Sequence, residues 1–327
     1  MTRLLTIVTL AFIAVITPAP QVFRSGVDGI VVVASVRHGN RPVTGLTAAD
    51  FQLTDNGVLQ RISSVAAEKV PLDLTLLLDL SSSVDGPQLQ RIKKAVSDTA
   101  ELLRPDDRIR LIAISQVLQE VFPFQPRSAA IALEGLRAEG ATSLYDGMAA
   151  TMMRPGDAGR RQLIVAFTDG RDSTSIIDQK TALEVARRSD AVVSIVVPVE
   201  AAEASNTRRL AQRNTVDSLS GAGNLATDGR GPGAVGADGV PTALAQLVAP
   251  TGGLVIPLGT GESISRVFKA TLEAFRASYV LQYSAEGVAE EGWHELSVTV
   301  KRRSGLEIRA RKGYMGRGRI ASPGEKR

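Results

Sequence analysis

The sequence predicts an α/β fold in which a doubly wound, mostly parallel sheet lies between two β-rich flanks. From residue 70 to residue 276, apolar segments that fit buried strands alternate with segments of helical spacing, as in a parallel sheet with right-handed crossovers. Apolar residues at a period of two follow residue 276, and β-branched residues and a hairpin signal mark residues 22–69. The 327 residues are 44% hydrophobic and 22% charged, which is typical of a globular protein.

The first 21 residues have the features of an export signal. Arg3 precedes an apolar run from Leu4 to Ile16, and Thr17-Pro18-Ala19 follows. This order of a basic, an apolar and a small-residue region is typical of a secretory signal peptide. The run is shorter than the roughly 20 apolar residues of a transmembrane helix. We therefore expect a secreted or periplasmic protein, or one that an uncleaved N-terminal segment anchors to the membrane.

Two β units flank the centre of the chain. Residues 22–69 contain a β-branched run at Ile30–Val36 and the two-residue hairpin signal Asp55-Asn56-Gly57. Residues 277–315 contain three alternating strands, and residues 316–327 form a basic tail. Because neither unit is long enough to bury a core alone, we expect the two to form one small β-sandwich, with the α/β domain inserted between them.

The central domain, residues 70–276, should contain five strands and six helices. Residues 203–240 are rich in Gly, Asn, Asp and Ser, so we expect a flexible insertion there, with one short helix around residues 208–212. Its glycines match no phosphate-binding loop. The expected strands lie at 72–78, 109–114, 163–167, 192–197 and 253–256, and the expected helices at 88–103, 128–136, 144–153, 181–188, 244–248 and 264–275.

Oxygen-bearing side chains gather where the predicted strands end. The first strand runs into Asp79-Leu80-Ser81-Ser82-Ser83, a later strand runs into Thr168-Asp169-Gly170, and Thr142 precedes a helix. Ligands of open α/β sheets bind outside the carboxyl ends of strands, where the strand order reverses. We expect the strand ending at Asp79, first in its sheet, and the strand ending at Asp169, the fourth, to be neighbours at that point.

Two carboxylates and three hydroxyls form a set of hard oxygen donors. Such donors favour Mg²⁺, with Mn²⁺ or Ca²⁺ as alternatives, over Zn²⁺ or Cu²⁺. Hydroxyl ligands keep the negative charge of the site low, so a bound cation can accept a further carboxylate from a partner. Ser and Asp after a strand also cap helices, which is the simpler reading of each residue alone. The predicted metal ligands are Asp79, Ser81, Ser83, Thr142 and Asp169.

These motifs resemble a known site. Residues 79–83, Ala141-Thr142-Ser143-Leu144-Tyr145-Asp146 and residues 167–172 are similar to the metal-ion-dependent adhesion site (MIDAS) of von Willebrand factor A domains. The resemblance covers about residues 70–275. It implies a Rossmann-like von Willebrand A fold in which the five ligands hold the metal directly or through water. It also implies a protein partner that presents Asp or Glu to the metal, and no enzymatic activity.

The flanks resemble those of a narrower group. Residues 23–27, 43–51 and 309–314 are similar to the corresponding segments of bacterial von Willebrand factor A-related domain proteins. Proteins of that group are mostly exported, so the resemblance implies an extracytoplasmic role in protein binding or cell adhesion. Residues 203–240 look like an insertion relative to the simpler family pattern.

Several nearby residues have simpler explanations. We expect Asp146 to cap or orient its helix and Asp172 to be a solvated loop carboxylate. His38 and His294 are not placed to act with Ser81, and the sequence has no hydrolase elbow or zinc-protease motif. The absence of Cys excludes disulfides, thiolate metal sites and a lipid anchor on cysteine.

Charge gives little support for a nucleic-acid partner. The net charge is +4, and basic residues are mostly interleaved with acidic ones. The basic C-terminal tail fits a solvated segment, with weak contact to an anionic envelope as the functional alternative.

Two other functions compete with adhesion. One is a Mg²⁺-dependent phosphatase or phosphotransferase, although Ser81 stands where such an enzyme normally has a second Asp. The other is a structural module in which the metal only stiffens loops.

Overall fold

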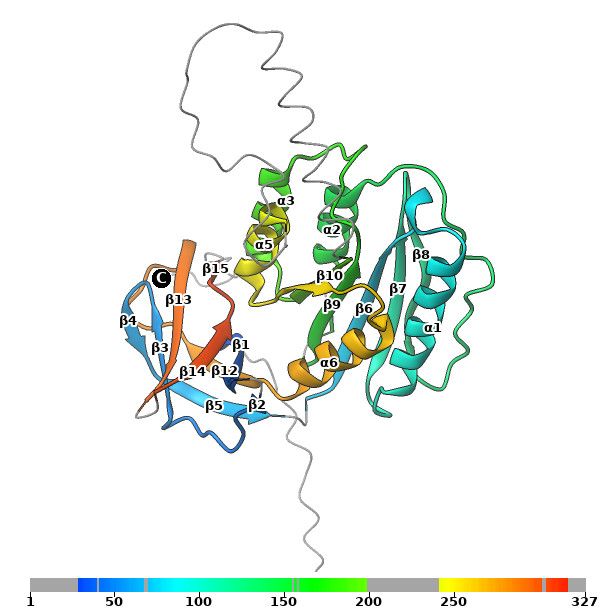
Figure 1. Cartoon of the computed structure of the whole chain (residues 1–327). Helices are drawn as coiled ribbons and strands as arrows, with labels where there is room; N and C mark the ends of the chain where they lie inside the picture. The colour runs from blue at the N-terminus through cyan, green and yellow to red at the C-terminus, as the bar shows by residue number, and fades with distance from the viewer. Residues whose placement is uncertain are drawn as a thin grey trace, which may run out of the picture.

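The computed structural model describes residues 29–39, 41–67, 70–154, 156–157, 159–198, 241–301 and 304–316. Two parts are visible: an α/β domain on the right and a β-sandwich on the left (Figure 1). The first described strand, β1, belongs to the sandwich; the chain leaves the sandwich after β5, builds the α/β domain, and returns to the sandwich at β12. The two strands that bracket the inserted domain are β5 (Ile62–Ala67) and β12 (Tyr279–Ser284).

The sheet of the α/β domain has the strand order β11-β10-β9-β6-β7-β8. All neighbours are parallel except β7 and β8, which are antiparallel. Every residue of the central strand β6 is buried, because helices cover both faces of the sheet. The strands are β6 (Leu72–Asp79), β7 (Arg108–Ile114), β8 (Leu118–Pro126), β9 (Arg161–Phe167), β10 (Val192–Pro198) and β11 (Val255–Leu258).

Strand order reverses at β6, which pairs with β7 on one side and β9 on the other. The first and fourth strands of this sheet are therefore neighbours, as expected. One helical layer holds α1 (Pro87–Glu101) and α6 (Ile264–Arg276), and the other holds α2 (Leu144–Met152), α3 (Gln179–Arg188) and α5 (Thr242–Val248) (Figure 1). Two short 3₁₀ helices are η1 (Ser82–Val84) and η2 (Ala249–Thr251).

The sandwich consists of two antiparallel sheets. One has the order β14-β1-β12-β5, with β2 paired to β1, and the other has the order β15-β13-β3-β4. The β3–β4 turn places Asn56 at φ 46° and Gly57 at φ 80°, the left-handed backbone that the Asp-Asn-Gly signal predicts. The remaining strands are β1 (Gly29–His38), β2 (Arg41–Pro42), β3 (Phe51–Asp55), β4 (Val58–Gln60), β13 (Gly292–Val300), β14 (Leu306–Ala310) and β15 (Gly313–Gly316).

Both ends of the chain contribute to one sandwich core. Val32 and Phe51 from the N-terminal flank pack with Tyr279, Leu281 and Leu296 from the C-terminal flank. The Phe51 and Tyr279 rings meet edge to face at 5.2 Å between centroids. The expectation that the two flanks form a single sandwich is confirmed.

Three expectations about the central elements need correction. Residues 128–136 form no helix: the segment is a loop whose Leu133 and Leu136 are buried against the α1 side of the sheet. The edge strand β8 was not expected, and the last strand begins at Val255 rather than 253. The buried leucines of this loop are spaced like residues on one face of a helix, which explains the wrong prediction. The expected helix at 208–212, the whole insertion at 203–240, the export segment and nearly all of the basic tail lie outside the described residues.

Within the described ranges, none of the helices has the length and apolar character needed to cross a membrane.

Candidate metal centre

Asp79 lies at the carboxyl end of the central strand β6 and is 1% exposed. Its Oδ1 accepts a hydrogen bond from the Ser81 backbone N–H at 3.1 Å, which turns the chain sharply into η1. The Leu80 N–H bonds to the Ile114 carbonyl at 2.8 Å, so the end of β7 fixes the start of this loop. The carboxylate is thus held rigidly at the point where the strand order reverses.

The loop before α2 brings Thr142 to the same carboxylate. The Thr142 hydroxyl donates to Asp79 Oδ1 at 3.1 Å, and Thr142 is buried. The two loops are joined by backbone hydrogen bonds from Ser82 N to Gly140 O and from Glu139 N to Leu80 O. Gly140 has a φ of 76°, a conformation that few residues other than glycine adopt readily.

The loop after β9 supplies the third side of the site. The Thr168 hydroxyl donates to Asp79 Oδ2 at 2.8 Å, and Thr168 is 1% exposed. Asp169 follows it, and its Oδ1 accepts from the Arg171 N–H at 2.9 Å. The Arg171 guanidinium lies 3.7 Å from the other Asp169 oxygen. Asp79 therefore receives hydroxyl hydrogen bonds from two different loops.

The surroundings of Asp79 disfavour the charged form of its carboxyl group. Burial raises the pKa of its carboxyl, repulsion from the Asp169 carboxylate raises it further, and hydrogen bonds from Thr168 and Ser81 oppose the shift. A buried carboxylate beside a second one favours its neutral form unless positive charge is close. A bound divalent cation would reverse this preference.

The serines stand on the loop that follows Asp79. Ser81 is buried and precedes η1, within which Ser83 lies; the side chain of Ser83 is outside what the structure describes. Asp79, Thr142 and Ser81 are joined by hydrogen bonds, and Asp169 is close enough to affect the ionisation of Asp79. Metal binding by the five residues stays a prediction.

Thr168 was missed by the sequence reasoning, which noted it in the motif and gave it no role. The available signal was its position directly after a buried strand, beside Asp169, where a hydroxyl faces the carboxyl end of the neighbouring strand.

Asp146 and Asp172 fasten the surrounding loops. The Asp146 carboxylate accepts from the Ile176 and Ile177 backbone N–H groups at 2.9 and 3.0 Å. Asp172 Oδ1 accepts from the Leu144 N–H at 2.8 Å, at the start of α2. Asp172 is exposed in its loop, as expected, and its carboxylate also accepts a hydrogen bond from an amide at a helix N-terminus, where its charge is favoured. Asp146 thus joins α2 to residues 176 and 177, and Asp172 joins the loop after β9 to the start of α2, two residues from Thr142.

The donor set fits a hard divalent cation. Among the described residues, no three Asp, Glu or His side chains gather as a metal-binding group. The oxygen donors described around the Asp79 carboxylate are hydroxyls, and the Asp169 carboxylate is nearby. Oxygen ligands of this kind suit Mg²⁺, Mn²⁺ or Ca²⁺.

Comparison with known proteins identifies the central domain. Residues 73–220 match the family model of the von Willebrand factor type A domain. The chain contains a von Willebrand factor A domain. Its sheet of mostly parallel strands, with antiparallel sheets beside it, agrees with the fold expected from the sequence.

The proteins compared with this chain match it over part of its length or at low sequence identity. An uncharacterized protein of Synechocystis, sll0103, is 34% identical over 110 residues, which are 32% of this chain and 26% of that protein. The chain thus spans about a quarter of this curated relative. A von Willebrand factor type A structure from Catenulispora acidiphila is 11% identical, with 90% of this chain and 75% of that chain covered and a TM-score of 0.46. A proximal thread matrix protein of the mussel byssus, with a zinc-occupied MIDAS motif, is 12% identical, with 68% and 50% covered and a TM-score of 0.44.

Proposed function

We propose that this chain is an exported, non-enzymatic binding and adhesion protein that holds a divalent cation at a MIDAS-type site. The cation is Mg²⁺, with Mn²⁺ or Ca²⁺ as alternatives, and an Asp or Glu of a protein partner completes its coordination. The ligands in this proposal are Asp79, Ser81, Ser83, Thr142 and Asp169.

One observation carries the proposal: the buried Asp79 carboxylate, with Asp169 nearby, is surrounded by hydroxyl groups from separate loops. Thr142 and Thr168 donate to its two oxygens at 3.1 and 2.8 Å. Both carboxylates and both threonines lie at the carboxyl ends of β6 and β9 or in the loop beside them, the edge where open α/β sheets bind ligands. A divalent cation there would offset the repulsion that raises the pKa of Asp79.

The same site gives little support for catalysis. Von Willebrand factor A domains are generally non-enzymatic binding modules. Ser81 stands where a phosphate-transferring enzyme would have its second Asp. His294 lies in the sandwich, where it pairs with Asp55 at 2.8 Å. A metal with few anionic ligands keeps enough positive charge to attract a partner's carboxylate, so recognition is the chemistry that this donor set favours.

Export is the part of the proposal that rests on the N-terminal sequence. Arg3 and the apolar run Leu4–Ile16 fit a secretory signal. A role in adhesion also requires that the protein be exposed to partners outside the cytoplasm. We therefore propose a secreted or periplasmic location, with an uncleaved N-terminal anchor as the alternative.

Calorimetric titration of Mg²⁺, Mn²⁺ and Ca²⁺ into the metal-stripped protein tests the site. We expect one saturable site, which disappears in Asp79→Ala. Asp98→Ala is the matched control, because Asp98 is a half-buried acidic side chain of α1, away from the candidate site, that pairs with Lys94 of α1 and Ser265 of α6. Binding that survives in Asp79→Ala would show that the cation is held elsewhere.

An open coordination position is testable with acetate as a stand-in for a partner's carboxylate. With Mn²⁺ bound, acetate should displace a metal-bound water and lower the proton relaxation rate of the solvent. A relaxation rate that acetate leaves unchanged would favour the alternative in which the metal only stiffens the loops.

A further inference from the structure

A cavity lies between the α/β domain and the outer face of the sandwich. Its volume is about 700 Å³, within the roughly 300–1,000 Å³ of small-molecule sites. Arg161 and Val192 line it from the first residues of β9 and β10. Asp79 stands at the opposite, carboxyl end of the same sheet. This junction cavity is therefore separate from the candidate metal centre.

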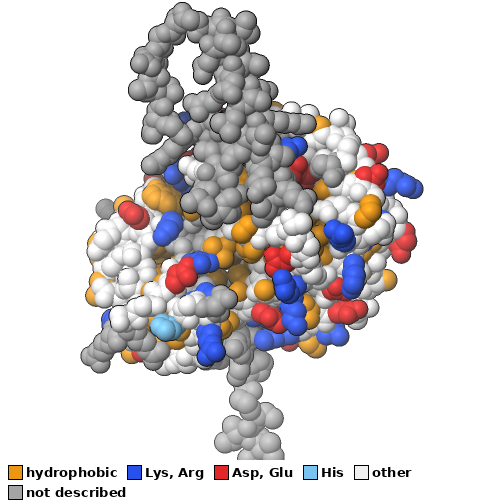
Figure 2. All heavy atoms as spheres, in the orientation of Figure 1, with side chains coloured by type: hydrophobic (Ala, Val, Ile, Leu, Met, Phe, Trp, Pro, Cys, Tyr) orange, Lys and Arg blue, Asp and Glu red, His pale blue; other side chains and the backbone are white. Residues whose placement is uncertain are grey.

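One wall of the junction cavity is apolar. Val31 and Val33 of β1 and Val280 of β12 line it, whereas the alternate residues Val32 and Ala34 point into the sandwich core. Val31 is 48% exposed although it lies within a paired strand. Hydrophobic side chains are visible between the two parts of the molecule in Figure 2. Apolar surface of this kind favours contact with an aliphatic group.

The opposite wall carries a buried arginine. Arg161 is 5% exposed, and its guanidinium lies 4.1 Å from the centroid of the Phe275 ring. Its Nη2 donates to the Phe275 carbonyl and the Ser278 hydroxyl, and its Nε has no hydrogen-bond partner in the part of the chain that the structure describes. Among the described residues, no carboxylate oxygen lies within 4.0 Å of a nitrogen of the Arg161 guanidinium.

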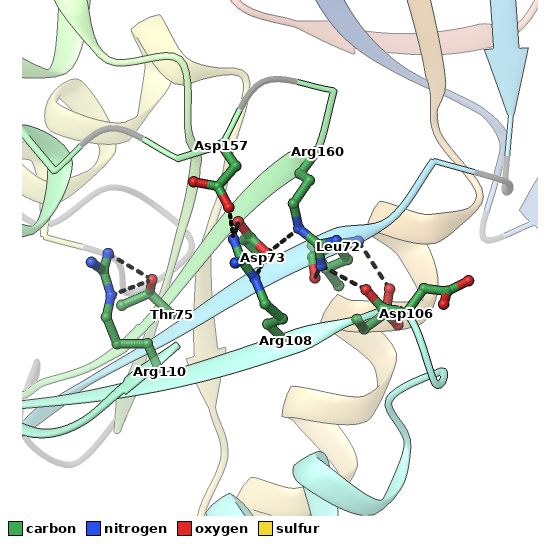
Figure 3. A network of polar contacts seen from close by, with 9 residues as sticks. Leu72, Asp73, Thr75, Asp106, Arg108, Arg110, Asp157 and Arg160 are labelled. Atoms are coloured by element: carbon green, nitrogen blue, oxygen red, sulfur yellow. Dashed lines mark hydrogen bonds and ion pairs between the residues drawn. The ribbon is translucent and has the colours of Figure 1, made fainter. Parts of the chain in front are cut away.

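Two other arginines that line the cavity, unlike Arg161, form ion pairs with carboxylates. Arg160 binds the buried Asp73 carboxylate at 2.5 Å, as Figure 3 shows, together with Arg108. Arg311 pairs with Asp190 at 3.0 Å. These positive charges have carboxylate partners, whereas the described groups in direct contact with the Arg161 guanidinium are neutral. Burying such a charge is unfavourable unless an anion lies close.

The electrostatic surroundings of Arg161 also disfavour its positive charge. Burial lowers the pKa of its guanidinium to about 10, and repulsion from Arg104 and Arg276 adds to the shift, while Asp107 acts against it. An anion in the cavity would lower the free energy of the charged form.

We propose that the junction cavity binds a small organic anion with an aliphatic body, of the chemical class of medium-chain carboxylates. The carboxylate lies toward Arg161, and the aliphatic chain lies along Val31, Val33 and Val280. This site adds a second ligand to the protein and does not depend on the proposed metal function.

Dodecanoate titrated into the full chain tests the proposal by calorimetry and by fluorescence. Trp293 is the only tryptophan, and it pairs across the sheet with Met315, which lines the cavity. We expect one saturable site and a change in Trp293 emission, both unaffected by EDTA and by Asp79→Ala. Loss of binding in Asp79→Ala would contradict the assignment of the site to the junction cavity, whatever the metal titration shows.

A matched pair of variants tests the charge. Val31→Glu and Val31→Gln have nearly equal shape at a half-exposed position, so both should fold. Because a like charge in a partly desolvated cavity repels the ligand, dodecanoate should bind Val31→Glu at least about tenfold more weakly than Val31→Gln. Arg161→Gln should weaken binding similarly where it folds, and dodecylamine should not bind the native chain at the same site.

Three results would overturn the proposal: no saturable binding of dodecanoate, equal affinity for dodecylamine, or equal affinities in Val31→Glu and Val31→Gln.

Discussion

The Asp79 carboxylate combines burial with several hydrogen bonds and a second carboxylate nearby. Ser81 N–H and the hydroxyls of Thr142 and Thr168 all donate to it. Hydrogen bonding stabilises its charged form, while burial and Asp169 disfavour that form and raise its pKa. Burial is the largest of these effects, so the metal-free protein carries an electrostatic cost at neutral pH that a cation can remove.

That cost gives a pH-dependent prediction for Asp79→Asn. Because the pKa of Asp79 is raised above its ordinary 3.8 in the folded state, the folded protein holds this proton more tightly than the unfolded chain. Metal-free wild-type protein should therefore lose stability as pH rises from 3.8 through the raised pKa. Asp79→Asn has no such proton and should lack this loss, as urea unfolding in EDTA at several pH values would measure.

Added Mg²⁺ should reverse the order at neutral pH, because binding stabilises only the protein that has the site. Asp98→Asn should behave as wild type in both conditions. If Asp79→Asn and wild type show the same pH dependence in EDTA, the raised pKa is not a property of the folded protein in solution.

The sandwich contains a buried carboxylate of its own. Asp55 is fully buried, its Oδ2 accepts from the hydroxyls of Tyr283 and Tyr314 at 2.8 and 2.9 Å, and its Oδ1 lies 2.8 Å from His294 Nδ1. Burial and the hydrogen bond to Asp55 raise the pKa of both tyrosines. These contacts join the two sheets of the sandwich.

We expect Asp55→Ala to lower the free energy of unfolding by about 3–5 kcal/mol, because three buried polar groups would lose their acceptor. Asp55→Asn should cost less, since its amide oxygen still accepts. Urea unfolding checks both values, with Glu307→Ala on the exposed edge strand β14 as control. A loss below about 1 kcal/mol in Asp55→Ala would mean that water replaces the carboxylate.

At the level of elements, α2 depends on a close approach to β7. A Cβ on Gly147 would lie 2.3 Å from Ile114 Cγ2, and Ile114 is 2% exposed. The helix therefore lies close to the end of the strand, and its N-terminus carries Thr142 toward Asp79. Glycine usually weakens a helix, so its presence here reflects packing.

Gly147→Ala should lower stability by about 1–3 kcal/mol through overpacking, and it should also weaken Mg²⁺ binding because α2 and the Thr142 loop must shift. Thermal unfolding and calorimetry measure the two effects. Gly135→Ala is the control, because a Cβ there would meet no atom within 4 Å. An unaltered or raised melting temperature in Gly147→Ala would show that Ile114 adapts freely.

Strands and helices with a clear apolar periodicity were predictable from the sequence. The loop at residues 128–136, whose buried residues have helical spacing, was not. The consecutive Leu76, Leu77 and Leu78 predict a strand buried on both faces, and all three are buried. Leu133 and Leu136 have helical spacing, yet each fills the core from an irregular loop. Periodicity reports which residues are buried, and tertiary contacts decide the backbone conformation.

The candidate site was predictable to a similar extent. Asp79, Thr142 and Asp169 were identified from their positions after strands and before a helix, because sheet topology brings such positions together. The roles of Thr168, Asp146 and Asp172 depend on which loop hydrogen-bonds to which, and this follows from three-dimensional contacts between segments far apart in the chain.

At the scale of the whole molecule, the N- and C-terminal flanks depend on each other. β1 pairs with β12 and β14, and β3 pairs with β13. Deleting residues 22–68 should therefore expose the C-terminal strands and remove their protease resistance, while the α/β domain keeps its own core. Limited proteolysis with mass spectrometry would follow both parts. C-terminal strands that stay resistant in the deleted protein would contradict this interdependence.

The bracketing of the inserted domain by β5 and β12 also determines how the protein responds to mechanical load. Ala67 and Tyr279 pair directly across these two strands, so the chain leaves and re-enters the sandwich at adjacent points. Tension applied between β1 and β15 would pass through the strand pairs of the sandwich. This tension would not reach the von Willebrand factor A domain until the β5–β12 pair separates. The parallel sheet of that domain would therefore stay unloaded while the sandwich is intact.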